Sequence, residues 1–407
     1  MGEHALAIEQ FERAISIEPG HINALCMLGA VLSELGRFDE AALYLRRALA
    51  GDDRSSHAHF NLGLVQFEQG DDAGALASFA RCRDLIRGRP WGEDCLTALA
   101  REPRPQFSPS AMRVSVLKLR HDCEQLQYLL ESGKLPRQFD AVLADHRALL
   151  GEMQDSFEDA MLTPFDAGRH PLVARTYKRP IHIAQDVALD GALINPRLDF
   201  RDIEDRYLVA RPNVMTVDEL LTPEALQALR HFCAESTIWN HVKEGFLGAY
   251  TQDGFCSALL LRLARELRDC LPRVIRRFPL QTMWGYKYDS RCPGIGIHAD
   301  GAAVNVNFWI TEDDANLDPA SGGLLVYPHE PPREWGFTRS NSDPAAVRDY
   351  LESLGSVPRR IPYRANRAVI FDSDLYHATD QLHFRSGYLN RRTNITLLYG
   401  VRSAPVL

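Results

Sequence analysis

The chain has 407 residues, of which 45% are hydrophobic and 25% are charged, so it can bury ordinary cores and is not a disordered protein. This length predicts about two or three domains. The net charge of −8 and the sequence pI near 6.0 argue against a nucleic acid or an anionic membrane as the main partner, because both require a basic surface.

The lack of recognisable targeting signals and the scattered cysteines together favour a reducing compartment. The sequence has no apolar run of about 18 residues or more, so we predict no membrane span. Its first residues, Met1-Gly2-Glu3-His4, lack the basic and apolar regions of a secretion signal. The eight cysteines are scattered and form no CxxC pair, which indicates free thiols. We therefore expect a cytoplasmic protein.

The N-terminal part of the sequence repeats with a period of 34 residues. Leu28-Gly29 recurs as Leu62-Gly63, and Gly36 recurs as Gly70. Three further positions recur twice each: Ala7, Ala41 and Ala75; Phe11, Leu45 and Phe79; Ala14, Ala48 and Cys82. Small residues let two helices approach closely, and large ones fill the groove between them, so the pattern predicts stacked helix pairs.

This pattern resembles the tetratricopeptide repeat, a helix–turn–helix unit of the same length. The register holds over two and a half units, because the chain starts at what would be the second helix of the first unit. The resemblance implies either a structural solenoid or a concave surface that binds a peptide or a partner protein, and we favour binding.

The sequence divides into three predicted regions. Residues 1–100 are TPR-like helical repeats, residues 101–209 form a helical extension and connector, and residues 210–407 form a strand-rich domain. The proline-rich segment Arg101–Pro109 is the linker candidate. Between residues 110 and 153 the leucine spacing predicts two helices, separated at Gly133 and Pro136. Residues 154–208, with weak periodicity and several prolines, are expected to be a wrapping connector.

The third region changes from helices to short strands. A strand at 213–220 precedes a helix that Thr222-Pro223 opens, and another helix is predicted over 257–277. Residues 330–363 form an insertion with one helix near 344–354. The predicted strands are 282–288, 295–300, 304–311, 323–327, 367–371 and 393–399. Short strands without interleaved helices predict a sandwich or a barrel.

A metal-binding pattern lies in these strands. On a strand over 295–300, His298 and Asp300 point the same way. His377 follows the apolar strand 367–371 through a short turn. Two imidazoles and one carboxylate can hold one face of a ferrous ion and leave its other positions open. His329 and His383 are alternatives to His377, and Asp300 also fits a turn before a glycine.

The last predicted strand has an unusual polar face. Arg392, Asn394 and Thr396 share one side by alternation, and an arginine there can bind a carboxylate through two N–H groups. A register shift of one residue would turn Arg391 inward instead.

Three residues of the strand at 304–311 share one face: Asn305, Asn307 and Trp309. Two asparagines inside a barrel are costly unless something bonds them. These residues therefore either line a substrate or co-substrate pocket or belong to a solvated sheet face.

His298-x-Asp300, the distal His377 and Arg392-x-Asn394 together resemble the Fe(II)- and 2-oxoglutarate-dependent dioxygenases, over roughly residues 210–400. The resemblance implies a double-stranded β-helix in which His298, Asp300 and His377 hold Fe(II). It also implies that Arg392 binds 2-oxoglutarate, with Asn394 as a further candidate, and that O2 takes the last open position.

The combination is also similar to the animal-type prolyl 4-hydroxylases, in which helical repeats precede an oxygenase domain. Tyr288 stands where the prolyl hydroxylase branch places a tyrosine that binds 2-oxoglutarate, and Tyr286 is its face-mate. Those enzymes use a lysine where this chain has Arg392, so their substrate is not transferred to it.

The expected fold class is α+β multidomain, with an N-terminal all-α TPR-type solenoid followed by a double-stranded β-helix (jelly roll). The expected reaction is hydroxylation, or another C–H oxidation, coupled to 2-oxoglutarate decarboxylation. Asn305, Asn307, Tyr286 and Trp309 are the substrate-pocket candidates. The alternatives are a TPR scaffold with an inactive barrel, a biosynthetic oxygenase acting on a small molecule, and a cupin-like metal enzyme that uses no 2-oxoglutarate. The sequence contains no phosphate loop, HExxH or GxSxG motif.

Overall fold

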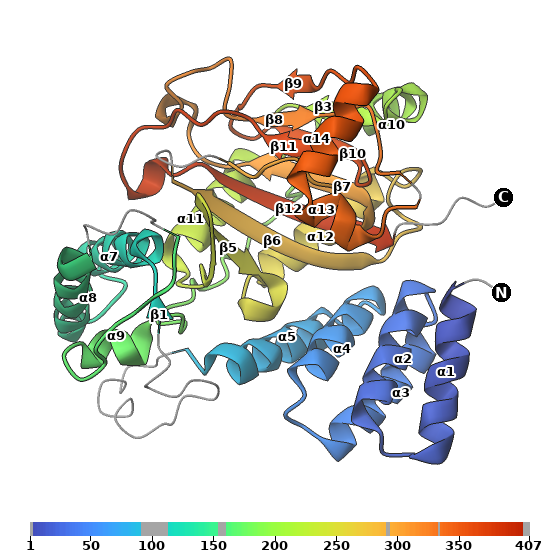
Figure 1. Ribbon diagram of the computed structural model, residues 1–407, viewed down its shortest axis with the longest axis horizontal. Helices are drawn as coiled ribbons and strands as arrows, with labels where there is room; N and C mark the ends of the chain where they lie inside the picture. Colours follow the sequence, from blue (N-terminus) through green and yellow to red (C-terminus); the bar gives the residue numbers. More distant parts are fainter. Residues whose placement is uncertain (1–2, 91–112, 154–159, 290–293, 333, 402–407) are drawn as a thin grey trace.

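The computed structural model describes residues 3–90, 113–153, 160–289, 294–332 and 334–401. A helical array lies against a strand-rich body, and a second group of helices flanks that body (Figure 1). The linker candidate Arg101–Pro109 lies outside the described residues, as does the domain limit expected at residue 100. The division into these three regions stays a prediction.

The N-terminal array consists of successive helix pairs. Its helices are α1 (Glu3–Ile17), α2 (Ile22–Glu34), α3 (Phe38–Gly51), α4 (Ser56–Glu68) and α5 (Asp72–Arg87). A Cβ atom added to Gly29 would lie 2.6 Å from Leu45 Cγ, and one added to Gly63 would lie 2.7 Å from Phe79 Cε1. The residues that recur in the sequence are therefore the ones at which paired helices touch.

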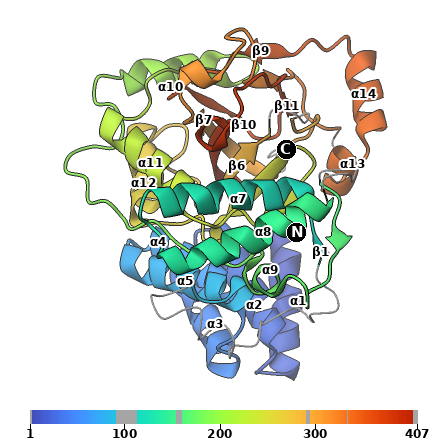
Figure 2. The same ribbon diagram turned by 90° about the vertical axis from the view of Figure 1, so that its left-hand side faces the viewer.

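The middle region contains the two predicted helices, α7 (Val116–Glu131) and α8 (Asp140–Met153), which lie side by side (Figure 2). Gly133 follows α7 with a φ of +68°, a conformation that favours glycine. The expected connector also contains α9 (Pro171–Thr176) and α10 (Phe200–Val209). Helix α10 was not predicted; it begins after Asp199, whose side chain accepts a hydrogen bond from the Asp202 amide.

The strand-rich body is built on a large antiparallel sheet with the strand order β3-β10-β7-β12-β6-β5-β4. Helices α11 (Pro223–Glu235) and α12 (Ala258–Cys270) pack on one face of it, in a core that includes Val306, Phe308, Ile395 and Leu397. The strands are β3 (Val214–Val217), β4 (His241–Lys243), β5 (Phe246–Tyr250), β6 (Leu280–Tyr288), β7 (Ala302–Trp309), β10 (Ala368–Asp372) and β12 (Thr393–Val401).

A smaller sheet faces the other side of the large one. Its strands, in the order β11-β8-β9, are β11 (His377–Thr379), β8 (Leu324–Val326) and β9 (Arg359–Ile361). A second apolar cluster joins the sheets, with Trp309 and Phe371 from the large sheet and Val326 and Ile361 from the small one. The predicted class, a helical repeat region followed by a jelly-roll body of two antiparallel sheets, is confirmed.

Several predicted elements differ in detail. Residues 295–300 do not form a strand, and only a single bridge joins His298 to His377. Helix α12 ends at Cys270 rather than at Arg277, because Pro272 disfavours the helical conformation at Leu271.

The insertion is also more structured than predicted. It contains α13 (Phe337–Ser342) in addition to the expected α14 (Pro344–Ser353), and its end supplies β9. Strands β4, β5, β9 and β11 were not predicted, because each has five residues or fewer and little alternation of its own.

The helical array and the body share one apolar core. Phe67 of α4 and Phe79 of α5 belong to the same buried cluster as residues of α12 and β6. Around this contact, Arg268 of α12 pairs with Glu68 at 2.7 Å, and the second carboxylate oxygen of Glu68 accepts from the Leu280 amide at 2.8 Å. At the end of α5, Arg87 pairs with Asp253 at 2.5 Å. The last repeat is therefore part of the folded body.

The six cysteines that the structure describes are free thiols. Among the described helices, none combines the length and the apolar character needed to cross a bilayer.

Truncating Phe67 tests whether the array and the body unfold together. Phe67 is 0% exposed within the shared core, so Phe67→Ala should lower the free energy of unfolding by about 3–5 kcal/mol. Chemical denaturation followed by tryptophan fluorescence measures this value. Leu43→Ala is the control, because Leu43 is 57% exposed on α3. A loss no larger than that of the control would contradict the shared core.

Candidate active site

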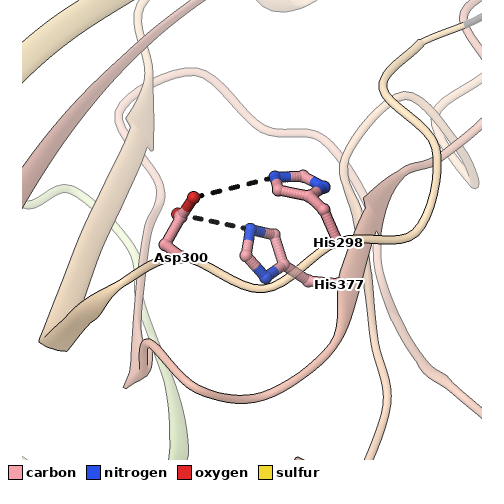
Figure 3. A group of neighbouring side chains, drawn as sticks. All are labelled: His298, Asp300 and His377. Atoms are coloured by element: carbon pink, nitrogen blue, oxygen red, sulfur yellow. Dashed lines mark ion pairs between the residues drawn. The ribbon is translucent and has the colours of Figure 1, made fainter. Parts of the chain in front are cut away.

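Three potential metal ligands meet between the two sheets (Figure 3). His377 Nε2 lies 3.5 Å from Asp300 Oδ2, and His298 Nε2 lies 3.9 Å from Asp300 Oδ1. One ligand atom of each residue lies within 4.8 Å of the others, and no other such trio is found in the described ranges. Metal bonds of about 2.0–2.2 Å place neighbouring ligand atoms about 3 Å apart, so a small inward movement would close the site on an ion.

The backbone brings the two histidines together. The His298 amide donates to the His377 carbonyl at 3.0 Å, and the His377 amide donates back to His298 at 2.8 Å. The imidazole rings consequently lie with their centres 4.2 Å apart.

Each imidazole is also oriented by a second contact. His298 Nδ1 lies 2.8 Å from the Gly296 carbonyl, and His377 Nδ1 lies 2.9 Å from the Leu375 carbonyl. A carbonyl only accepts, so Nδ1 carries the proton in both rings. The lone pair is left on Nε2, which faces Asp300, as a metal ligand requires.

The protonation states also suit metal binding. Burial, and then the neighbouring His377, lower the pKa of His298 to about 4, so His298 is neutral near pH 7. Burial alone would raise the pKa of Asp300, but its contacts with both histidines and a hydrogen bond from Asn305 outweigh burial and lower it. A neutral imidazole and a carboxylate are the forms that ligate a metal.

Asn305 holds the carboxylate of Asp300 in place. Its Nδ2 donates to Asp300 Oδ2 at 2.8 Å, from the inward face of β7. From the sequence, Asn305 was expected in a pocket or on a solvated sheet face. In the structure its side chain is buried and contacts Asp300, one of the three potential ligands. It therefore orients Asp300 from outside the trio.

Arg392 points inward and Arg391 points outward. The Arg392 Nε donates to the Gly322 carbonyl at 2.6 Å, Nη2 to the Gly323 carbonyl at 3.2 Å and Nη1 to Asn394 Oδ1 at 3.3 Å. Its guanidinium carbon lies 4.6 Å from the ring centre of Tyr288 and 5.5 Å from that of Trp309. Within the described residues no carboxylate pairs with Arg392. Arg391, by contrast, pairs with Glu124 and Asp289 on the other face of the sheet.

A ladder of polar side chains runs from Arg392 along the inner face of the large sheet. Asn394 Nδ2 donates to Thr396 Oγ1 at 3.2 Å, and Asn307 Nδ2 donates to the same oxygen at 2.8 Å. Three buried atoms along this face have no partner in the described part of the chain: Asn305 Oδ1, Asn307 Oδ1 and Trp309 Nε1. Buried polar atoms are nearly always bonded, so these atoms indicate that a polar ligand belongs in this space.

An aromatic wall, formed by Tyr250, Trp284 and Tyr286, continues the inner face beyond the trio. The three ring centres lie 5.9–6.0 Å apart, and the Tyr250 and Tyr286 hydroxyls are 3.0 Å from each other. Burial, and then neighbouring groups that include Asp300, raise the pKa of Tyr286 well above its usual value. Only Tyr286 was proposed from the sequence. Trp284 shares its strand face and could have been found by alternation, whereas Tyr250 lies on the unpredicted β5.

The alternative histidines do not join the trio. His329 Nδ1 lies 2.8 Å from Ser356 Oγ in the insertion, and His383 is exposed on a loop. The insertion instead supports the HxD segment, since Asn341 Oδ1 accepts from the Ala299 amide at 2.9 Å.

The repeats match a known family. The tetratricopeptide repeat family matches residues 26–90. Tetratricopeptide repeat protein 7B of Mus musculus is 34% identical over 80 residues, which is 20% of this chain. The chain spans about a tenth (10%) of the length of that relative. The N-terminal region therefore contains tetratricopeptide repeats.

Solved structures similar to the chain cover about half of it. The non-heme alpha-ketoglutarate-dependent carbocyclase SnoK of nogalamycin biosynthesis has 13% identity and a TM-score of 0.38, covering 52% of this chain and 87% of its own. A Pseudomonas putida prolyl-4-hydroxylase has 15% identity and a TM-score of 0.33, covering 50% and 100%. HygX of Streptomyces hygroscopicus, with nickel, 2-oxoglutarate and hygromycin B bound, has 10% identity and a TM-score of 0.33, covering 48% and 85%.

Replacing two neighbouring asparagines separates a residue that orients a ligand from one that does not. Asn305→Ala removes the hydrogen bond to Asp300 and should weaken Fe(II) binding by about 10–100-fold, measured by anaerobic metal titration. Asn307→Ala is the matched control, because Asn307 lies on the same strand face but donates to Thr396. Equal losses in both variants would contradict a specific role for Asn305.

Proposed function

We propose that the chain is an Fe(II)- and 2-oxoglutarate-dependent dioxygenase that hydroxylates, or otherwise oxidises a C–H bond of, its substrate. The observation that carries this proposal is the meeting of a neutral imidazole, a second imidazole and a carboxylate in one space, together with a buried guanidinium, Arg392, that has no acidic partner among the described residues. Two histidines and one carboxylate that leave open positions are the typical ligand set of non-heme Fe(II) oxygenases.

In this proposal His298, Asp300 and His377 hold Fe(II) through two Nε2 atoms and a carboxylate oxygen. Bound Fe(II), together with 2-oxoglutarate and O2, supplies the oxidising power that protein side chains lack. The chain itself contributes position: carbonyl groups orient both imidazoles, and Asn305 orients the carboxylate. Each ligand atom therefore has a defined direction before a metal binds.

Arg392 is the proposed anchor for 2-oxoglutarate. Its guanidinium is buried, and its partners in the described chain are two carbonyls, one amide oxygen and two ring faces, all of them uncharged. A carboxylate would supply the missing negative charge through two parallel hydrogen bonds. Tyr288 lies against the guanidinium and Asn394 accepts from it, so both would position Arg392 for this contact.

The aromatic wall is the proposed substrate surface. It stands beside Asp300 and offers the flat, largely apolar faces of Tyr250, Trp284 and Tyr286, with two hydroxyls for hydrogen bonding. Such a surface excludes water and suits a substrate with an apolar or planar part. A peptide side chain and a small molecule both meet this description.

We further propose that the tetratricopeptide repeats bind a peptide or protein, either the substrate or a partner, and that the protein works in the cytoplasm. Large apolar side chains are exposed along the array, among them Met27 at 40% and Leu43 at 57%. Deleting the array would uncover Phe67 and Phe79, so it would confuse recruitment with folding. A better test screens a peptide array with the intact chain and with the variants Met27→Asp and Leu43→Asp. Peptide binding that survives both substitutions would argue against a binding role for the repeats.

Removing the proposed anchor should weaken 2-oxoglutarate binding without removing the metal. Arg392→Met loses charged hydrogen bonds and should need about 10–100-fold more 2-oxoglutarate for half-saturation. The measurement is the weak visible charge-transfer band of the anaerobic Fe(II)–2-oxoglutarate complex, with succinate release as a second readout. Arg391→Met is the control, and it should change half-saturation only a few-fold, because Arg391 faces α7. His377→Ala should abolish both signals.

Two outcomes would contradict the proposal. If the intact chain gives neither a band nor succinate, the protein is a repeat scaffold with an inactive barrel. If metal binds but Arg392→Met does not change the 2-oxoglutarate concentration for half-saturation, the interpretation as a cupin-like metal enzyme that uses no 2-oxoglutarate is favoured.

A further inference from the structure

Strand β6 presents different side chains on its two faces. Tyr286 and Tyr288 point into the space between the sheets, so Lys287 points the opposite way, toward the helices packed on the large sheet. Lys287 is only 4% exposed. The proposed oxygenase chemistry makes no use of this lysine.

The partners of Lys287 carry no negative charge. Its Nζ lies 4.4 Å from the ring centres of both Trp239 and Tyr388, and it donates to the Tyr388 hydroxyl at 2.8 Å. No ion pair among the described residues includes Lys287. An ammonium has three donors, and buried lysines are almost always paired with an acid, so this contact set is incomplete.

The nearest acidic groups are already committed to other cations. Glu124 of α7 pairs with Arg391 at 2.9 Å, and Asp122 of the same helix pairs with Lys118 at 2.8 Å. The Cys233 thiol of α11 supplies no charge, because burial raises its pKa to about 12. None of these groups gives Lys287 an ion pair, so an anion bound from outside the chain would be its first charged partner.

A cavity of about 210 Å³ opens beside Lys287. Its lining includes the buried Cys233 and Ala234, the rings of Tyr128 and Tyr388, and Leu389, which is 60% exposed. Pockets for drug-sized ligands measure about 300–1,000 Å³, so this one suits a smaller molecule. Lys287 and Thr393 line it, and they alternate with Tyr288 and Arg392, so it lies on the face of the large sheet opposite the metal trio.

We propose that this cavity is a second ligand site, which takes a small monocarboxylate with an apolar body. The carboxylate pairs with Lys287, and the body lies against Tyr128, Tyr388 and Leu389. Arg230, the other cation at the cavity, already donates to Glu312 and to the Ile310 carbonyl. A second carboxylate on the ligand would therefore lack a cationic partner, so a dicarboxylate is disfavoured. The site uses none of the proposed metal or 2-oxoglutarate residues and does not depend on the proposed function.

Protonation of Lys287 sets the pH range of binding. Burial and the nearby Arg391 lower its pKa to about 7, against the opposing effects of Cys233, Glu124 and Asp122. A bound carboxylate favours the charged amine and raises this pKa, so the dissociation constant should increase by up to about tenfold per pH unit above pH 7. The other charged or titratable groups that line the cavity are Tyr128 of α7, Arg230 and His231 of α11, Glu312, and Tyr388 of η5 (Tyr388–Asn390). His121 of α7 packs against the Tyr388 ring and senses the charge of Lys287.

Benzoate and its neutral analogue benzamide test the site directly. The chain has only five lysines, so ¹³C-lysine labelling gives few NMR signals, and Lys287→Met identifies the Lys287 signal by its loss. We expect benzoate to shift this signal and to move its titration midpoint upward from about pH 7, whereas benzamide leaves both unchanged. The inference is overturned if benzoate leaves the signal unmoved between about pH 6 and 8, or if benzamide moves it equally.

A second pair of variants keeps the test decisive if Lys287→Met does not fold. Leu389 lines the cavity and is largely exposed, so substitutions there spare the core. Leu389→Asp should weaken benzoate binding at least tenfold by repulsion, while the isosteric Leu389→Asn should weaken it much less. Equal affinities in the two variants would place benzoate elsewhere and reject the site.

Discussion

Two backbone hydrogen bonds between His298 and His377 determine the geometry of the candidate site. They form an isolated bridge rather than a ladder, yet they join residues that are distant in the sequence and set the imidazole centres 4.2 Å apart. Because both Nδ1 atoms also bond to carbonyls, neither ring can turn away without breaking a second contact. Asp300 completes the trio, and the insertion supports the same segment through Asn341. The ligand directions are thus fixed by the fold, and a metal would bind to an arrangement that already exists.

Strand alternation accounts for most of what the sequence predicted. It placed Asn305, Asn307 and Trp309 on one face of β7 and Arg392 and Asn394 on one face of β12, and the structure brings these two faces together between the sheets. His298 and Asp300 lie at the predicted site, but a different backbone structure holds them there. His298 and Asp300 were expected to share a strand face, but the segment has no strand, and the bridge to His377 holds it instead. The residue types alone identified the potential ligands. The backbone conformation around His298 and Asp300, by contrast, depends on the distant segment that contains His377.

What the sequence did not predict depends on contacts between distant segments. Phe79 recurs with Phe11 and Leu45, so its position in the repeat does not reveal a second contact, whereas Phe67 stands where the preceding unit has Ser33. In the structure they also enter the core shared with α12 and β6. Tyr250 was missed for a similar reason, because its strand, β5, has only five residues. Strand β5 is held by pairing with the longer strand β6. Short strands gain their stability from the sheet that receives them, so their own pattern is weak.

Strand β6 contributes to both the proposed metal and co-substrate site and the cavity at Lys287, and its register limits how one can influence the other. Tyr288 packs against Arg392 on the inner face, and Lys287 lines the cavity on the outer face. Both residues are held by pairing with β12, in which the Tyr288 amide donates to the Arg392 carbonyl at 2.9 Å and Lys287 lies opposite Thr393. A ligand at Lys287 can change the proposed binding of 2-oxoglutarate only if it favours one arrangement of these strands over another. A central strand paired on both sides offers few alternative arrangements, so a ligand in the cavity at Lys287 would act first on the stability of the folded chain, by mass action.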